Sequence, residues 1–367
     1  MKISCAQTDL LKGLQISQRA VPLKTTMSIL ECILIDASGN DIRLTANDME
    51  LGIETIIPGS IIEHGRVCLD AKIFVDMVRN LSNNQVTLYS DENNFTSIDC
   101  EKAHFEVPGK SGDEFPYLPI IPRNDPIRIS QYSLRDIIQK TIFSVADNDT
   151  KPVLKGELME ISGKNMRLSS LDGHRISIRN LTLKDEYEDC SVILPGKTLN
   201  EVAHIVGGSM DDMVLIYLAE NQVLFEFERT TVVSRLIEGK FFDINRMLSD
   251  DYETKITINR RDLMESIGRS VLMVNEADRK PIVLDIHDQV FGMTISSFKG
   301  NFNEELVMVK EGRDIKIAFN PKFILDALKA IDDETITMYL LSPRAPLFIR
   351  NEAKDYIYII LPVNFNS

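Results

Sequence analysis

Apolar and polar positions follow the same order three times along the chain. In each copy an apolar strand is followed by a two-residue break, a lysine, an amphipathic helix and a second apolar strand. These segments span residues 67–89, 192–217 and 317–339. The lysines Lys72, Lys197 and Lys322 are 125 residues apart both times (197 minus 72, and 322 minus 197). This period exceeds the repeats of solenoid proteins, so each copy is predicted to be a whole domain.

A second apolar pattern supports the repeat. Leu10, Leu134 and Leu263 each begin a helical pattern at the head of a copy, at spacings of 124 and 129 residues (134 minus 10, and 263 minus 134). Two elements that recur in the same order favour three homologous domains over three unrelated α+β domains. The expected boundaries are 1–123, 124–249 and 250–367.

The hydrophobic periodicity predicts two helices and about eight strands in each domain. Helices are expected at residues 10–20, 71–81, 133–145, 199–206, 261–274 and 323–330. Strands are expected at residues 29–35, 41–46, 51–58, 95–100, 103–107, 154–162, 165–170, 175–181, 214–217, 223–228, 232–237, 282–287, 292–297, 336–341, 347–350 and 356–361. Because strands outnumber helices, we expect an α+β fold with two helices on mostly antiparallel sheets. Prolines within 115–122 predict an extended linker there.

Composition narrows the class of protein. Apolar residues make up 44% of the chain and charged residues 26%, as in ordinary soluble globular proteins. Residues 1–9 lack the apolar core of a signal peptide, and no apolar run is long enough to span a bilayer. The five cysteines are scattered and never in CxxC spacing, which indicates reduced thiols rather than disulfides or a zinc site. A cytoplasmic protein without membrane contact, metal or cofactor is therefore expected.

The formal net charge of −14 argues against a protein that grips nucleic acid by a broad basic face. The predicted helices and their flanks nevertheless carry cations in every copy, namely Lys12, Arg19, Lys72, Arg79, Arg135, Lys140, Lys197, Arg260, Arg261, Arg269, Lys322 and Lys329. These cations either form solvated helix faces or line a surface that makes weak, sequence-independent phosphate contacts.

Domain size decides whether a ring could enclose DNA. A domain of this length has a radius of gyration of roughly 13–14 Å, so the centres of neighbouring domains lie about 30 Å apart. Six domains in a hexagon leave a hole of roughly 30 Å, whereas three leave almost none. Duplex DNA is roughly 20 Å across. Two chains paired head to tail would therefore enclose a duplex, and enclosure requires no strong attraction to hold the DNA.

Two motifs resemble one known family. They are Ser-Leu-Asp-Gly-His-Arg-Ile at 170–176, and Tyr-Leu-Leu-Ser-Pro at 339–343 followed by Ile-Leu-Pro-Val at 360–363. Together with the threefold repeat, they resemble the bacterial β sliding clamp, the processivity subunit of DNA polymerase III, along the whole chain. The resemblance implies a homodimeric six-domain ring around duplex DNA in the bacterial cytoplasm, associated with the nucleoid. It also implies a pocket between the second and third domains for short linear peptides of the replicative polymerase, the clamp loader and repair polymerases.

The resemblance assigns the pocket by position. Its expected walls are Leu154, Leu171, Gly173, His174, Arg175, Ile176, Phe242, Arg246, Met247, Ser342, Pro346, Ile359, Ile360, Leu361, Pro362 and Val363. His174 and Arg175 are expected to orient peptide carbonyls or acids. Phe242 replaces a common proline, Leu171 replaces a common threonine, and the tail 364–367 lacks the usual basic residue. The peptide preference therefore stays open.

The resemblance also implies contacts with DNA and between subunits. The expected DNA-facing residues are Lys24, Lys72, Asn148, Lys151 and Lys197. The expected dimer interface comprises Phe105, Val107, Val271, Leu272, Glu304 and Glu305, with Lys72 pairing with one of the two glutamates. Phe105 and Val107 alternate along a predicted strand, so they are either interface residues or core residues.

Catalytic alternatives are weaker. Gly196, Lys197 and Thr198 suggest a phosphate-binding loop, but that motif needs a glycine where this chain has Ser191. Ser170, Asp172 and His174 share one short stretch and cannot form a catalytic relay, and the five histidines have no metal-ligand spacing. A non-catalytic clamp is expected, with a hydrolase or a scaffold that does not bind DNA as the alternatives.

Overall fold

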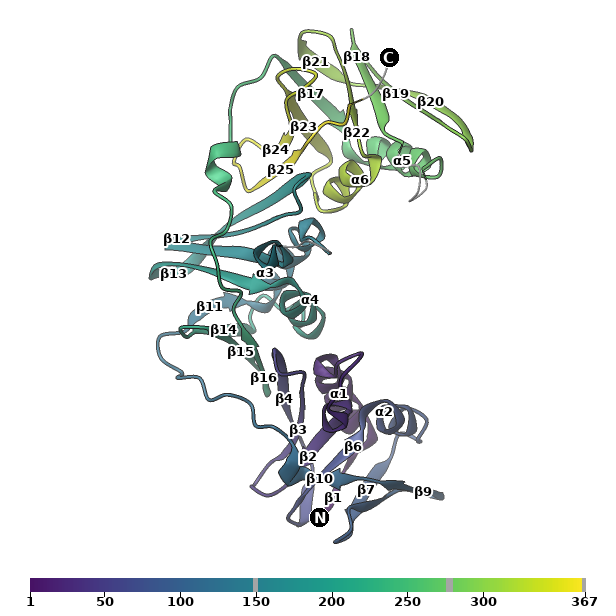
Figure 1. Ribbon diagram of the computed structural model, residues 1–367, viewed down its shortest axis with the longest axis vertical. Coiled ribbons are helices and arrows are strands. Elements are labelled where there is room, and N and C mark those ends of the chain that lie inside the picture. Colours follow the sequence, from purple (N-terminus) through teal and green to yellow (C-terminus); the bar gives the residue numbers. More distant parts are fainter. Residues whose placement is uncertain (148–150, 275–279, 365–367) are drawn as a thin grey trace. The chain divides into compact units, whose positions relative to one another are not determined.

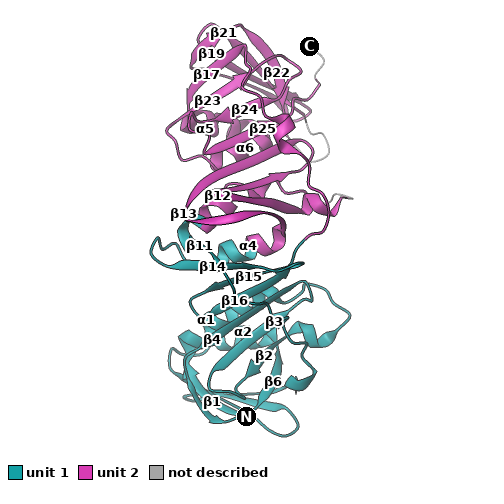
Figure 2. Ribbon diagram, turned by 90° about the vertical axis from the view of Figure 1, so that its left-hand side faces the viewer, with its two compact units in different colours: residues 1–133, 201–236 teal, residues 134–200, 237–367 magenta. Residues whose placement is uncertain are grey.

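The computed structural model of the protein describes residues 1–147, 151–274 and 280–364. These residues form two compact units, one from residues 1–133 and 201–236 and the other from residues 134–200 and 237–367 (Figure 2). The central copy of the repeat contributes to both units. Asn148, an expected DNA-facing residue, lies outside the described residues.

Within the described residues, six α-helices recur at the predicted places (Figure 1). They are α1 (Gln7–Ser17), α2 (Ala71–Arg79), α3 (Gln131–Gln139), α4 (Gly196–Ile205), α5 (Arg260–Val271) and α6 (Pro321–Lys329). The two-residue break before the repeated lysine is a helix start. Asp70 caps α2 by accepting from the Ile73 amide (2.9 Å), and Asn320 caps α6 by accepting from the Lys322 amide (3.0 Å). The repeated lysine therefore stands in the first turn of each helix.

The first unit contains two antiparallel sheets. Their strands are β1 (Lys2–Ala6), β2 (Cys32–Asp36), β3 (Ile42–Asn47), β4 (Leu51–Ile57), β5 (Ser60–Glu63), β6 (Arg66–Asp70), β7 (Gln85–Ser90), β8 (Phe95–Cys100), β9 (Ala103–Pro108), β10 (Lys110–Ser111), β11 (Ile127–Ser130), β14 (Met213–Leu218), β15 (Gln222–Phe227) and β16 (Thr230–Arg235). One sheet has the order β5-β1-β7-β8-β9 and the other β10-β6-β2-β3-β4-β16-β15-β14-β11. Helices α1 and α2 pack side by side (Figure 1).

The described part of the second unit also contains two antiparallel sheets. Their strands are β12 (Gly156–Leu171), β13 (Arg175–Pro195), β17 (Thr254–Asn259), β18 (Ile282–His287), β19 (Val290–Ser297), β20 (Gly300–Val307), β21 (Val309–Gly312), β22 (Ile315–Phe319), β23 (Thr335–Leu340), β24 (Leu347–Arg350) and β25 (Tyr356–Ile360). One sheet has the order β12-β13-β25-β24-β23-β17-β21 and the other β20-β19-β18-β22. Helices α5 and α6 pack together.

Strand pairing repeats along the chain as the sequence pattern does. The strand before the first helix of each copy pairs with the strand after the second helix, giving β1–β7, β11–β14 and β17–β23. A second set of equivalent pairs is β2–β6, β12–β13 and β18–β22. The predicted α+β class with mostly antiparallel sheets is confirmed.

The linker at residues 115–126 packs closely against β4. Residues 115–126 contain no helix or strand, as the prolines predict. Leu118 of this linker lies so close to Gly52 on β4 that a Cβ there would meet its side chain at 2.2 Å. A larger residue at position 52 would force the Leu118 side chain to move.

Four expected elements differ from the structure. The helix expected over 133–145 ends at Gln139 and resumes as a 3₁₀ turn at Ile142–Ser144, because the Thr141 hydroxyl bonds back to the Ile137 carbonyl (2.8 Å). The strand expected over 29–35 begins with a 3₁₀ turn at Ser28–Glu31. The strands expected at 154–162 and 165–170 form one long strand, β12, with a bulge at Gly163.

Candidate binding cleft

Three cross-strand neighbours form an apolar floor in the second unit. In the strand register Leu171 of β12 lies opposite Ile176 of β13, and Ile176 lies opposite Ile359 of β25. All three side chains belong to one buried cluster, which also contains Leu154 from the 3₁₀ turn Pro152–Lys155. The strand alternation therefore places a row of branched apolar side chains on one face of the sheet.

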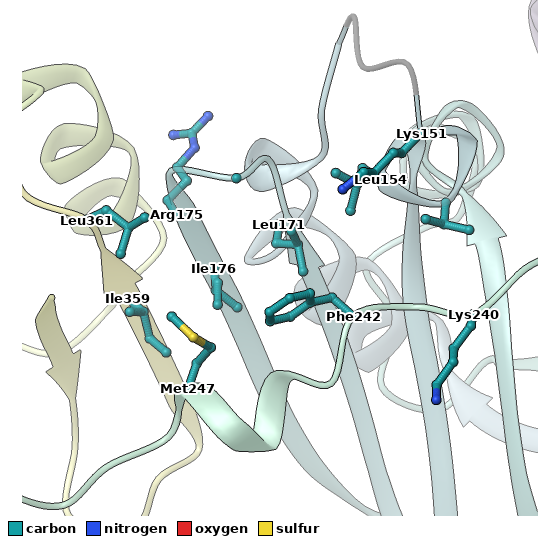
Figure 3. A pocket seen from close by; sticks show the side chains of 12 residues that line it. Lys151, Leu154, Leu171, Arg175, Ile176, Lys240, Phe242, Met247, Ile359 and Leu361 are labelled. Atoms are coloured by element: carbon teal, nitrogen blue, oxygen red, sulfur yellow. The ribbon is translucent and has the colours of Figure 1, made fainter.

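A cleft of about 350 Å³ opens over this floor (Figure 3). The segment 240–247 supplies its other wall, with Phe242 and Met247 facing the floor and Phe242 52% exposed. Nine expected residues line the cleft: Leu154, Leu171, Gly173, Arg175, Ile176, Phe242, Met247, Ile359 and Leu361. The volume is within the usual range of ligand sites and suits one or two apolar side chains.

A tight turn joins the two strands that form most of the floor. The Asp172 carboxylate accepts hydrogen bonds from the backbone amides of His174 (3.0 Å) and Arg175 (3.1 Å). Gly173, which lies between Asp172 and His174, has φ of 85°, a left-handed backbone conformation that residues with a Cβ disfavour. No neighbour lies within 4 Å of the place where a Cβ would stand, so backbone conformation and not space selects glycine here.

Arg175 braces the end of the cleft. Its guanidinium donates to Asp172 (2.9 Å), to Asp326 of α6 (2.7 Å) and to the Phe143 carbonyl. The same group lies over the Phe323 ring, 4.5 Å from its centroid. Figure 3 shows the side chain pointing away from the floor. Arg175 therefore positions the turn, and its expected role in orienting peptide carbonyls or acids stays a prediction.

Seven expected wall residues do not line the cleft: His174, Arg246, Ser342, Pro346, Ile360, Pro362 and Val363. Strand alternation explains Ile360, which points into the core of the third copy while Ile359 faces the cleft. The His174 ring stacks on Phe323, with the ring centroids 6.1 Å apart. Arg246 is exposed and pairs with Asp243 (3.0 Å).

The remaining members of that group lie in the turn after β23 and in the C-terminal segment. Ser342 and Pro346 flank the β23–β24 turn, where the Ser342 carbonyl accepts from the Ala345 amide (3.1 Å). The Val363 amide donates to the Ala318 carbonyl (2.8 Å), which draws Val363 and the neighbouring Pro362 toward β22.

Three lining residues were not assigned to the cleft from the sequence. They are Lys151, Val153 and Lys240. Lys151 was expected to face DNA, and the 3₁₀ turn that it precedes brings Val153 beside the expected Leu154. Lys240 lies two positions before Phe242 on the same irregular segment. This closeness in sequence to an expected wall residue could have indicated that Lys240 lines the cleft.

The other expected DNA-facing lysines are on the surface. Lys24 is exposed in the loop between the 3₁₀ turns Gln18–Ala20 and Ser28–Glu31, Lys72 is exposed on α2, and Lys197 is exposed on α4. Several helix cations are paired within the chain, including Arg19 with Glu201 (2.8 Å). Fewer cations are therefore available to phosphate than the sequence suggests.

The expected interface residues lie on sheet edges and a helix end. β9 is an edge strand, and its Phe105 and Val107 are half-buried rather than part of the core. β20 is likewise an edge strand, and Leu272 at the end of α5 is 68% exposed. Glu305 is exposed.

Glu304 already has a partner in its own chain, Arg269, which donates to it in a bidentate pair with one arm at 3.1 Å. The expected pairing of Lys72 with Glu304 would compete with this contact. Hydrogen bonding from Arg269 lowers the pKa of Glu304, as an engaged carboxylate requires.

Neither a metal centre nor a membrane span stands out in the described residues. No cluster of three or more His, Cys, Asp or Glu side chains within them is arranged to hold a metal ion. Within the same residues, no helix is both long and apolar enough to cross a bilayer.

The threefold pairing, the antiparallel sheets and the cleft define a clamp-type protein built from repeated α+β domains. Models of the N-terminal, central and C-terminal domains of the DNA polymerase III beta subunit match residues 1–119, 128–243 and 245–364. A beta sliding clamp of Staphylococcus epidermidis is 34% identical over 356 residues, 94% of each chain. The chain therefore belongs to the DNA polymerase III beta subunit family.

Solved structures agree with this family. A crystal structure of a putative DNA polymerase III beta subunit from Eubacterium rectale is similar over the whole of both chains, with a TM-score of 0.96 and 53% identity. The DNA polymerase sliding clamp from Bacillus subtilis is similar over the whole of both chains, with a TM-score of 0.95 and 28% identity.

Proposed function

We propose that this chain is a DNA sliding clamp, a ring-shaped processivity factor that encircles duplex DNA, slides along it and tethers the replicative polymerase and other partners. Membership of the family supports the class. The apolar cleft is the observation that carries the tethering role, because a short extended peptide can insert apolar side chains between the floor and the wall formed by Phe242 and Met247. The clamp loader and repair polymerases are proposed to use the same cleft.

The ring is proposed to close between β9 of one chain and the β20–α5 region of a second copy. Unpaired strand edges are templates for pairing with another chain, and both strands are edges of their sheets. Apolar contacts from Phe105, Val107, Val271 and Leu272 are expected to supply most of the interface stability. Exposed ion pairs contribute only about 0–1 kcal/mol each, so Glu305 and Lys72 would add little.

DNA is proposed to be held by enclosure. Lys24, Lys72, Lys151 and Lys197 would make weak phosphate contacts that permit sliding, and Asn148 is proposed with them by position. Three domains, with boundaries at 1–123, 124–249 and 250–367, would supply half of the ring. No catalytic residue, metal or cofactor is assigned to this role, and the protein would act in the cytoplasm at the nucleoid.

A processivity assay tests the proposal. Wild-type protein, loaded on a primed circular template with its cognate polymerase and loader, should lengthen the products made in one binding event. Leu171→Asp places a charge in the apolar floor and should abolish this gain, and loading by the clamp loader should fall as well because the loader is proposed to use the same cleft. Lys102→Glu, an exposed change in the turn after β8, is the control and should behave as wild type. Equal processivity of all three proteins would refute the tethering role of the cleft.

A further inference from the structure

Successive repeats are joined by equivalent strands at both junctions within the chain. At the first junction β16 of the central repeat pairs with β4 of the first, and at the second β25 of the third repeat pairs with β13 of the central one. β20 corresponds to β4 and β13 in the third repeat, since each is the second strand of a hairpin. β9 and β20 are both edge strands, so each chain carries the two halves of a third junction that a partner chain can complete.

Ladders of directly opposite residues fix the register at the junctions. The two ladders that cross a junction within the chain are Tyr217, Leu224, Val233 and Gly52, and Tyr339, Phe348, Ile359 and Ile176. Both begin at a tyrosine on the strand that follows the second helix of a repeat, and the first repeat has Tyr89 there. The ladder of Tyr89 continues through Ser97 to Glu106 and stops, because β9 is the edge of its sheet. Its next member would come from β20 of a partner chain.

The turn before β20 identifies that missing residue. Each of the three turns has a side-chain oxygen that accepts from the backbone amide two residues later. These pairs are Asp48 and Glu50 before β4 (2.9 Å), Asp172 and His174 before β13 (3.0 Å), and Ser297 and Lys299 before β20 (3.2 Å). Four positions after the accepting residue lie Gly52 and Ile176, the ladder members of the two junctions, and the same count reaches Asn301 (52 minus 48, 176 minus 172, and 301 minus 297). The repeat therefore places Asn301 of a partner chain opposite Glu106.

The next pair of each junction belongs to its buried layer. These pairs are Val232 with Ile53 and Tyr358 with Ser177, and all four side chains are at most 1% exposed. In the same register the third junction brings Phe105 opposite Phe302 of a partner chain. Both rings are half-buried in the single chain, and Phe302 already packs against the core of the third repeat. Pairing across the strands would bury the rest of both rings.

An ion pair also recurs at the two junctions within the chain. Its carboxylate, Glu201 on α4 or Asp326 on α6, lies four residues after the repeated lysine (201 minus 197, and 326 minus 322). Glu201 accepts from Arg19, just beyond the end of α1 in the preceding repeat (2.8 Å). Asp326 accepts from Arg175 of the preceding repeat (2.7 Å), and Arg175 also donates to the Phe143 carbonyl just beyond α3. Each second helix is thus tied to the end of the preceding first helix.

Lys299 takes the place of Arg175 in the third repeat. Its amino group donates to the carbonyl of Leu272 at the end of α5 (3.3 Å). The carboxylate with the matching position in the first repeat is Asp76 on α2, again four residues after the repeated lysine (76 minus 72). Asp76 is exposed and pairs with the equally exposed Arg79 on its own helix (2.9 Å), a contact that contributes little stability. Asp76 can therefore accept a cation from a partner chain.

We propose that the junction between two chains reproduces the junctions within one chain, with Phe105 opposite Phe302 of the partner chain and Asp76 paired with its Lys299. This inference rests on the proposed function, because it assumes that the ring closes between β9 and β20. The ion pair differs from the lysine–glutamate contact that the resemblance implies. A slip of two residues along the strands would separate the two rings and the two charges together, so both features select one register.

Cysteine cross-linking tests the register. His104 and Glu106 on β9, and Asn301 and Asn303 on β20, are exposed. The double variants His104→Cys/Asn303→Cys and Glu106→Cys/Asn301→Cys match the proposed register. The double variants His104→Cys/Asn301→Cys and Glu106→Cys/Asn303→Cys match strands slipped by two residues. The rate at which covalent dimers form under mild oxidation is followed on non-reducing gels.

The matched variants should cross-link about tenfold faster than the slipped ones, because directly opposite Cβ atoms are about 4.5–5.5 Å apart and diagonal ones about 7–8 Å. Wild-type protein is the control. Four of its five cysteines are buried, so it should form no covalent dimer on the same timescale.

Charge exchange tests the ion pair. Asp76→Lys and Lys299→Asp each place like charges at both junctions between the chains, so the Kd of the dimer should rise about tenfold in low salt. The double variant Asp76→Lys/Lys299→Asp restores opposite charges and should return Kd to within about threefold of wild type. Lys164→Asp, an exposed change at the bulge of β12, is the control and should leave Kd unchanged. Sedimentation over a dilution series measures Kd, and circular dichroism checks that each variant is folded.

The outcomes separate this inference from the proposed function. Faster cross-linking of the matched variants, together with recovery in the double charge exchange, would support it. Faster cross-linking of a slipped variant, equal rates in all four, or a double exchange as weak as the single variants would overturn it while the dimer itself stands. Wild-type protein that sediments as one chain at micromolar concentration would instead overturn the proposed ring, and this inference with it.

Discussion

A buried carboxyl group should make the second unit less stable as pH rises. Glu157 on β12 is fully buried, and one of its oxygens has no hydrogen-bond partner among the described residues. The other oxygen lies 2.6 Å from the Thr141 hydroxyl, which also lies 2.8 Å from the Ile137 carbonyl. The hydroxyl has a single proton for these two acceptors. A protonated Glu157 resolves this, because it can donate to the hydroxyl while the hydroxyl donates to Ile137.

The size of the stability loss follows from the pKa shift of Glu157. Burial raises the pKa of Glu157 from 4.5 to about 8, and the bond to Thr141 offsets only part of this. Between these pH values the folded protein keeps a proton that the unfolded chain has released, so the free energy of unfolding falls as pH rises. At 1.36 kcal/mol per pK unit, the loss is on the order of 3–5 kcal/mol, complete above about pH 8.

Glu157→Gln removes the titratable carboxyl group and keeps the shape of the side chain. The variant should match wild type near pH 5 and become more stable than wild type by several kcal/mol at pH 9. Urea unfolding followed by circular dichroism from pH 5 to 9 measures this difference. Glu160→Gln is the control on the same strand, where the side chain is partly exposed and the difference from wild type should stay small. A Glu157→Gln difference that does not change with pH would refute a protonated Glu157.

Three other substitutions test the cleft and the interface. Phe242→Ala should weaken peptide binding about tenfold by calorimetry with little change in stability, because half of the ring is exposed until a peptide covers it; unchanged affinity would exclude the ring as a cleft wall. Leu272→Asp should shift the protein from the mass of two chains to that of one in analytical ultracentrifugation at micromolar concentration, and an unchanged dimer would contradict the proposed interface. Gly173→Ala should cost about 1–2 kcal/mol in urea unfolding because of its positive φ, and a neutral effect would show that the turn relaxes.

Periodicity predicted most of the fold because most elements bury one face. The six helices begin within about three residues of their expected places, a normal uncertainty for helix ends. The long strand β13 was only partly predicted, because residues 182–191 carry many charges and have no apolar alternation. Its pairing with β12 orders this segment, and such tertiary pairing is not visible in a local pattern.

The cleft was predicted by resemblance more than by physical pattern. Expected residues such as Ile359 line the cleft, but the resemblance gave no way to separate Ile359 from Ile360, which strand alternation sends to opposite faces. Lys151 and Lys240 are far apart in sequence and meet at the cleft only through the fold. Glu157 reads as an ordinary surface acid in a strand, and its burial becomes visible only in the structure.

The central claim is that a dimer of this chain encloses DNA and holds it by topology. The most direct measurement is the retention of labelled protein on closed circular DNA in 0.5–1 M salt, a range that suppresses phosphate contacts, before and after a restriction enzyme cuts the circle. Protein that stays on the closed circle and leaves only after cutting would agree with enclosure. Equal loss from circular and linear DNA would contradict it.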